Sequence, residues 1–156
     1  MGRVINVESA GKMRNQLVKA IVVAMRELAA QSKPDQNTRD LLAFIILSLE
    51  AISDTIDPSV SAWEKRGYWV KADRFRLDWQ WARNTAGQLR SALVTEDWTK
   101  IAGSMAEIGN HLADIQVSRH HRLGTPWKGA GKRSKIVSVP KLVGSSKSKA
   151  GNLVRW

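Results

Sequence analysis

The chain has 156 residues, with 25 Lys and Arg against 14 Asp and Glu, and it contains no cysteine. The length suits one domain with an appendage, and the missing cysteines exclude disulfides, thiol catalysis and zinc-finger chemistry. The longest apolar run, residues 41–52, is interrupted by Ser48 and Glu50 and is too short to span a bilayer. The N-terminus has no apolar segment typical of a secretory signal. The default expectation is therefore a cytoplasmic protein without membrane contact.

The first third of the chain predicts two helices. From about Ser9 to Gln31, apolar residues recur at helical spacing and form one face. From about Asp35 to Ile56, residues 41–49 are apolar on almost every side, which predicts the central and most buried helix. The sequence at residues 57–59, Asp-Pro-Ser, is then expected to stop this helix and to begin the next one.

Three further helices are expected. A short helix is predicted to end at Gly67, and a long helix with apolar heptad positions to run from Tyr68 to Val94. Thr95 is the expected N-cap of the last helix, whose apolar positions continue to Ile115. The sequence therefore predicts an all-α fold: an antiparallel four-helix bundle, with four long helices and one short helix, over residues 1–117. A basic, largely irregular C-terminal tail follows over residues 118–156.

Residues 61–83 alternate aromatic and basic side chains, a pattern typical both of single-strand binding and of an amphipathic helix with an aromatic core side. Heptad spacing places Phe75 and Trp79 in the core. A second apolar stripe is expected to contact the short helix or another subunit, and it consists of Val70, Leu77 and Trp81. Whether Trp63, Tyr68 and Trp81 face a partner stays open.

Three arginines recur every seven residues along one flank of the same predicted helix: Arg76, Arg83 and Arg90. One interpretation is a solvated flank that pairs with neighbouring carboxylates. The alternative is a secondary nucleic-acid-binding track that follows phosphates. Both interpretations remain open at this point.

The C-terminal tail holds nearly all of the net charge. Residues 115–156 contain ten Lys and Arg and no carboxylate, so they supply +10 of the formal charge of +11. A basic chain rich in Gly and Ser can follow a phosphate backbone and release its counterions, which predicts a polyanionic partner. The predicted nucleic-acid-binding residues are Arg119, Arg122, Lys128, Lys132, Arg133, Lys135, Lys141, Lys147 and Lys149, together with Trp127, which either stacks on a base or inserts at the junction between the last helix and the tail.

Enzyme chemistry finds little support in the sequence. Two rows of acidic and His residues have helical spacing, and a bundle could bring them together around a metal: Glu50, Asp54 and Asp57, and Glu107, His111 and Asp114. Such rows are usually solvated, and no phosphate-binding glycine loop is complete. We expect no catalytic residues, no metal and no cofactor.

These patterns favour a non-enzymatic nucleic-acid-binding subunit of a larger ribonucleoprotein assembly, with RNA preferred to DNA and with other protein subunits as partners. The tail would contact phosphates and the bundle would contact proteins. One alternative is a small helical subunit of a CRISPR effector complex that lines bound nucleic acid. Another is a helical adaptor whose basic tail docks on an acidic protein.

Overall fold

The computed structural model describes residues 7–119, 121 and 123–131, and this part of the chain forms five helices and no strand. The helices are α1 (Val7–Ala29), α2 (Gln36–Asp54), α3 (Ile56–Lys65), α4 (Trp69–Val94) and α5 (Trp98–His111). The predicted all-α bundle is confirmed. None of these helices combines the length and the apolar composition needed to cross a membrane.

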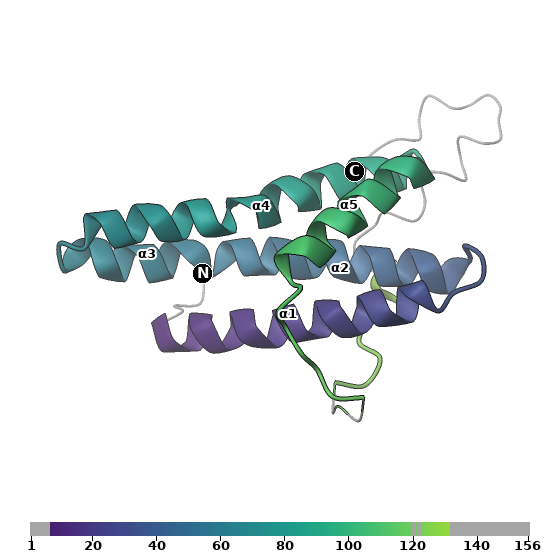
Figure 1. The fold of residues 1–156 in the computed structure, drawn as a ribbon, viewed down its shortest axis with the longest axis horizontal. Coiled ribbons are helices and arrows are strands. Elements are labelled where there is room, and N and C mark those ends of the chain that lie inside the picture. Colours follow the sequence, from purple (N-terminus) through teal and green to yellow (C-terminus); the bar gives the residue numbers. More distant parts are fainter. Residues whose placement is uncertain (1–6, 120, 122, 132–156) are drawn as a thin grey trace.

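Helices α2 and α3 form one nearly continuous column (Figure 1). Thr55, the only residue between them, has φ −85° and ψ −10°, so the chain keeps a helical direction through the joint. The predicted stop at residues 57–59 is therefore wrong. Asp57 and Pro58 lie in the first turn of α3, where proline fits because its missing N–H would be unpaired there anyway. The bundle thus has four columns, which run alternately up and down.

The central column is α2, which packs against α1 on one side and α4 on the other. Its side chains Leu41, Leu42, Ile45, Ile46, Leu49 and Ile52 are fully buried, as the all-round apolar run predicts. Helix α4 faces them with small residues, Ala82 and Ala86, followed by Leu89. Small residues on one helix let a neighbouring helix with bulky side chains approach closely, which explains why α2 can be buried from both sides.

Phe75 and Trp79 are partly buried rather than enclosed in the main core. Phe75 packs against a second, smaller cluster where α3 meets α4, and Trp79 contacts both clusters. The heptad spacing identified the correct face of α4. It overestimated the burial because the short helix α3 covers this end of α4 with few large side chains.

Two turns of similar geometry connect α3 to α4 and α4 to α5. In the first, Gly67 has φ +82°, its N–H donates to the Glu64 carbonyl, and the Tyr68 N–H donates to the Trp63 carbonyl. This is the Schellman arrangement in which glycine is favoured. The predicted helix end at Gly67 is confirmed.

The second turn has the same hydrogen bonds but carries a side chain at the left-handed position, Glu96, with φ +52°. Its carboxylate pairs with Arg39 at the start of α2. Asp97 is the N-cap of α5, and its side chain accepts a hydrogen bond from the Lys100 N–H at 3.2 Å. The predicted N-cap, Thr95, is instead the C-cap of α4, where its hydroxyl donates to the Ser91 and Ala92 carbonyls.

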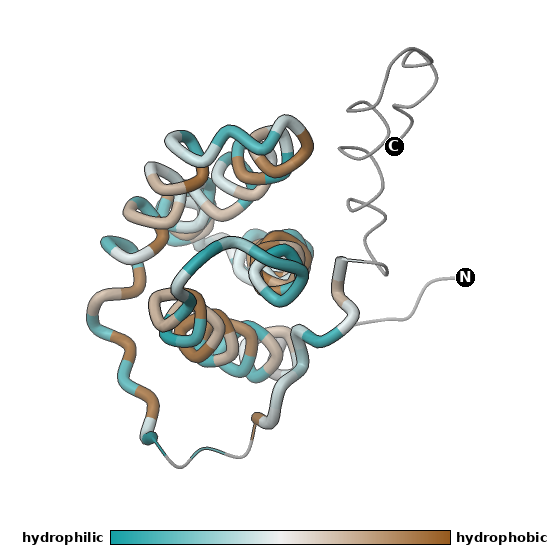
Figure 2. The backbone as a smooth tube through the Cα atoms, turned by 90° about the vertical axis from the view of Figure 1, so that its right-hand side faces the viewer, coloured by the Kyte–Doolittle hydropathy of each residue, from teal (hydrophilic) through white to brown (hydrophobic). Residues whose placement is uncertain are grey.

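After α5 the chain crosses α1 on one side of the bundle and returns on the other side (Figures 1 and 2). We call residues 115–131 the strap. Ile115 and Val117 are partly buried against the core but lie outside any helix, so the predicted continuation of the last helix to Ile115 is wrong. Arg26 of α1 donates to the Val117 carbonyl at 2.8 Å, which fixes the strap where it crosses α1.

The far end of the strap is attached to α2 by one carboxylate. The Asp40 side chain accepts hydrogen bonds from the backbone N–H groups of Gly129 and Gly131, both at 3.0 Å. Trp127, two residues before Gly129, and Ala130, between the two glycines, are buried in the main core cluster. Composition assigns residues 118–131 to the tail, but three residues of this segment are buried: Trp127, Ala130 and Gly131.

Candidate nucleic-acid interface

The basic residues predicted to bind nucleic acid divide into two groups in the structure. Arg119 and Lys128 are exposed on the strap. The others lie outside the described residues: Arg122, Lys132, Arg133, Lys135, Lys141, Lys147 and Lys149. Gly131, the last residue that the structure describes, is held by Asp40 in the first turns of α2.

Trp127 does not lie on the surface. Its side chain is only 4% exposed and belongs to the main hydrophobic core. Stacking on a base requires an accessible ring face, so the burial favours the other alternative, insertion at the junction between the bundle and the tail. Trp127 therefore attaches this segment to the bundle.

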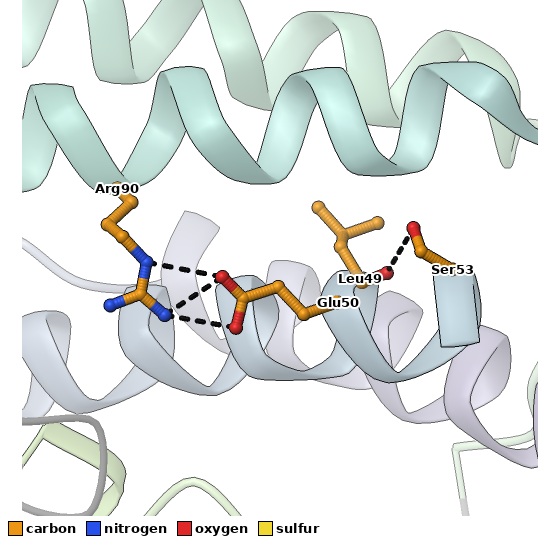
Figure 3. Close-up of polar contacts among 4 residues, drawn as sticks. All are labelled: Leu49, Glu50, Ser53 and Arg90. Atoms are coloured by element: carbon orange, nitrogen blue, oxygen red, sulfur yellow. Dashed lines mark hydrogen bonds and ion pairs between the residues drawn. The ribbon is translucent and has the colours of Figure 1, made fainter.

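The three arginines of α4 differ in their partners. Arg90 forms a bidentate ion pair with Glu50 of α2, with contacts of 2.9–3.2 Å (Figure 3). Arg76 contacts Glu64 of α3 at 2.8 Å and Asp73 at 3.3 Å. The hydrogen bond with Glu64 raises the pKa of the Arg76 guanidinium. These two arginines connect α4 to its neighbours.

Arg83, between them, is exposed and has no carboxylate partner in the part of the chain that the structure describes. It lines a groove of about 920 Å³ between α4 and α5. Lys100 also lines this groove, while Gly87 and Gly103 keep it open because neither carries a side chain. Of the predicted secondary track, Arg83 is thus the arginine best placed to meet a phosphate.

A fourth arginine, Arg14 of α1, has a structural position. Its guanidinium donates to the Thr55 hydroxyl at 2.9 Å and lies over the rings of Phe75 and Trp79, at 4.9 and 5.7 Å from their centroids. Partial burial lowers its pKa from the ordinary value. Arg14 thereby joins α1 to the α2–α3 joint and to α4, and its charge faces rings rather than solvent.

The aromatic residues of the 61–83 stretch also differ in what they pack against. Trp63 packs edge-on against Phe75, with centroids 4.8 Å apart. Trp81 is partly buried and stacks flat on His111 of α5 at 4.1 Å. The predicted contact between the second apolar stripe and the short helix is therefore wrong for Trp81, which turns toward α5.

The rest of that stripe is uncovered. Val70 is 74% exposed and Leu77 is 70% exposed. Tyr68 and Trp69 are exposed beside them, at 52% and 60%. Sequence reasoning left Tyr68 open and did not single out Trp69. The signal that could have found it is its position directly after the Gly67 turn, outside the heptad seam.

The acidic rows do not assemble into a metal site. Within the described residues, no group of three His, Asp or Glu side chains lies close enough to hold a metal ion. Glu50 is paired with Arg90, and Glu107 lies 4.0 Å from His111 on the same helix. These side chains therefore contact neighbouring residues on the surface of the bundle rather than one another across it.

Comparison with protein-family models, with curated proteins and with solved structures finds no match for this chain. Its function therefore has to be inferred from its own residues and geometry.

Proposed function

We propose that the protein is a non-enzymatic, cytoplasmic nucleic-acid-binding subunit of a larger ribonucleoprotein assembly, with RNA as the preferred nucleic acid. One observation carries this proposal: residues 115–156 hold ten Lys and Arg and no carboxylate. A segment with this charge attracts a polyanion, and single-stranded or folded RNA offers a continuous row of phosphates.

The bundle supports this division of roles because it is nearly neutral. Residues 1–114 contain 15 Lys and Arg against 14 Asp and Glu. Several of these charges are neutralised by each other in contacts between helices, such as Arg90 with Glu50 and Arg39 with Glu96. The bundle is therefore suited to contact proteins, and the tail to contact phosphates.

The strap supplies a fixed starting point for the basic residues of the tail that follow it in the sequence. Trp127 and Ala130 in the core and the Asp40 hydrogen bonds hold the chain up to Gly131. A basic segment that begins at a fixed point loses less freedom on binding than one that begins at a loose end. RNA is preferred to DNA because extended basic segments containing Gly fit between folded RNA segments.

The test compares two full-length variants that each remove three positive charges. The tail variant is Lys132→Gln, Arg133→Gln and Lys135→Gln. The control variant is Lys12→Gln, Lys19→Gln and Lys33→Gln, which changes exposed residues of the bundle. Binding of a labelled single-stranded RNA is measured by fluorescence anisotropy between about 50 and 300 mM salt.

Each phosphate contact on a single strand contributes about 0.7 to the slope of log affinity against log salt. We therefore expect the tail variant to reduce the slope by up to about 2, whereas the control leaves it nearly unchanged. An equal reduction in both variants would show that the charge of the whole protein, and not the tail, attracts RNA. A wild-type protein that does not bind RNA would refute the proposal directly.

A further inference from the structure

The end of the bundle where α3 turns into α4 exposes two aromatic rings in succession. Tyr68 is 52% exposed and Trp69 is 60% exposed, and Val70 beside them is 74% exposed. We call residues 65–74 the tip; in Figure 1 it is the end of the bundle at the left of the view. Large exposed rings are unusual on a near-neutral bundle whose other aromatic residues pack on neighbours, so these two are the most conspicuous unexplained feature of its surface.

The backbone holds these rings in a fixed position. Gly67 ends α3 with φ +82°, and the Tyr68 N–H donates to the Trp63 carbonyl at 2.9 Å. Trp69 is the first residue of α4. In the described part of the chain neither Tyr68 nor Trp69 has a ring partner, whereas Trp63 is packed against Phe75. The two exposed rings are thus presented on rigid elements and not used by the fold.

The charges around the rings are unbalanced. Residues 63–77 contain five Lys and Arg against two carboxylates. Both carboxylates, Glu64 and Asp73, pair with Arg76. Four other cations have no carboxylate partner among the described residues: Lys65, Arg66, Lys71 and Arg74. Of these, Lys71 lies over the ring of Trp63. The tip therefore combines accessible rings with positive charge that its own acidic residues do not neutralise.

We propose that the tip is a stacking platform for single-stranded nucleic acid, in which bases stack on Tyr68 and Trp69 and phosphates contact Lys65, Arg66 and Arg74. This site deepens the proposed function and rests on it, but it lies on a different part of the chain from the basic tail. Aromatic rings flanked by cations match a strand that alternates flat bases with phosphates.

Other partners fit the tip less well. A duplex keeps its bases stacked inside and offers the rings no base face. An apolar protein surface would bury the unpaired cations without compensation. Residues 67–71 line a shallow hollow at this end of the bundle. A flat base fits such a hollow.

The experiment uses the full-length chain with the double variant Tyr68→Ala and Trp69→Ala. The probes are a labelled single-stranded oligouridylate and a duplex RNA of equal length. Loss of stacking on one aromatic ring weakens binding by about 1–3 kcal/mol per base, or roughly 5- to 150-fold. We expect at least a fivefold loss for the single strand, less than a twofold change for the duplex, and an unchanged salt slope.

Two control variants isolate the rings. Leu77→Ala removes an exposed apolar side chain without a ring that lies outside the tip, and it should leave the affinity for the single strand unchanged. Tyr68→Phe with Trp69→Phe keeps a ring at both positions and should retain most of that affinity. If these controls weaken binding as much as the alanine variant, a stacking role is refuted.

The remaining outcomes separate the two proposals. Unchanged single-strand affinity in the Tyr68→Ala and Trp69→Ala variant overturns the stacking platform and leaves the tail proposal standing. Equal losses for single strand and duplex overturn it as well, as does a wild-type tip that binds anionic phospholipid vesicles through these rings but not RNA. If the tail variant keeps its salt slope while the tip variant loses affinity, the tail proposal fails and the platform stands.

Discussion

Replacing Trp127 by alanine tests the most unexpected position in the structure. The indole is 4% exposed and lies in the main core, although its surroundings in the sequence are basic and rich in glycine. A buried aromatic side chain removes about 150–250 Å² from water. At about 25 cal/mol per Å² this corresponds to roughly 4–6 kcal/mol, which is an upper estimate because the unfolded chain already buries part of this area.

The observed loss of stability is expected to be smaller, because the strap can detach while the helices stay folded. The loss in free energy of unfolding is then limited to the free energy with which the strap docks on the bundle. Substitutions of buried Phe and Trp by Ala typically cost about 3–5 kcal/mol. We expect a value near the lower end, about 3 kcal/mol, or a fall in Tm of roughly 6–12 °C for a chain of this size.

The measurement is urea and thermal denaturation followed by far-UV circular dichroism. Trp69→Ala is the matched control, because it makes the same chemical change at a residue that is 60% exposed, and it should alter stability by no more than about 0.5 kcal/mol. If both variants are equally stable, Trp127 is not in the core. If Trp127→Ala loses affinity for RNA without losing stability, the ring stacks on bases and does not hold the strap against the bundle.

Two other predictions concern named backbone contacts. Asp40→Ala removes the acceptor for the Gly129 and Gly131 N–H groups and should lower the free energy of unfolding by about 1–3 kcal/mol. Hydrogen exchange at these two amides should become faster. Unchanged exchange would contradict the attachment of the strap to Asp40. Gly67→Ala should destabilise the protein by about 1 kcal/mol because of its positive φ, whereas Gly87→Ala, in the middle of α4 with open space around it, should stabilise it by about 0.5–1 kcal/mol. Urea denaturation of this pair checks the opposite signs.

The helices could be predicted because their signal is local. An apolar face at helical spacing identified α1, α4 and α5, and the all-round apolar run of residues 41–49 identified the central helix. The joint at Thr55 was missed for a physical reason. Asp57 and Pro58 are favourable both as a helix stop and in a first helical turn, and only packing against α4 decides between these possibilities.

The strap could not be predicted because its contacts are not local. Asp40 is 89 and 91 residues from the two glycines that it binds. The composition of residues 118–131 indicates a chain that cannot fold alone, and this is consistent with the structure, since the segment packs on a bundle that other residues build. Trp127 was the one residue of this segment whose size pointed to burial. The sequence alone does not decide between its two predicted roles, stacking on a base and insertion at the junction with the tail.

The three arginines of α4 differ in whether they are paired with a carboxylate, and the sequence alone could not show this difference. Arg76, Arg83 and Arg90 have equal spacing, so a phosphate track predicts equal contributions from all three. The structure separates them, because Arg76 and Arg90 are paired with carboxylates and Arg83 is not. A paired guanidinium must first give up its partner before it can bind a phosphate, and the bidentate geometry of Arg90 makes that exchange the least favourable.

Under the proposed function, Arg83→Gln should therefore reduce the salt slope of RNA binding by about 0.7, the contribution of one phosphate contact. Arg90→Gln should leave the slope unchanged and lower stability by no more than about 1 kcal/mol, because the Glu50 pair is only partly buried. Anisotropy titrations at several salt concentrations and urea denaturation measure the two effects separately. Equal slopes for both variants, each below the wild-type slope, would mean that the ion pair opens when RNA binds and that the whole row acts as a track. Two slopes equal to that of the wild type would remove Arg83 and Arg90 from the interface and confine phosphate contacts to the tail and the tip.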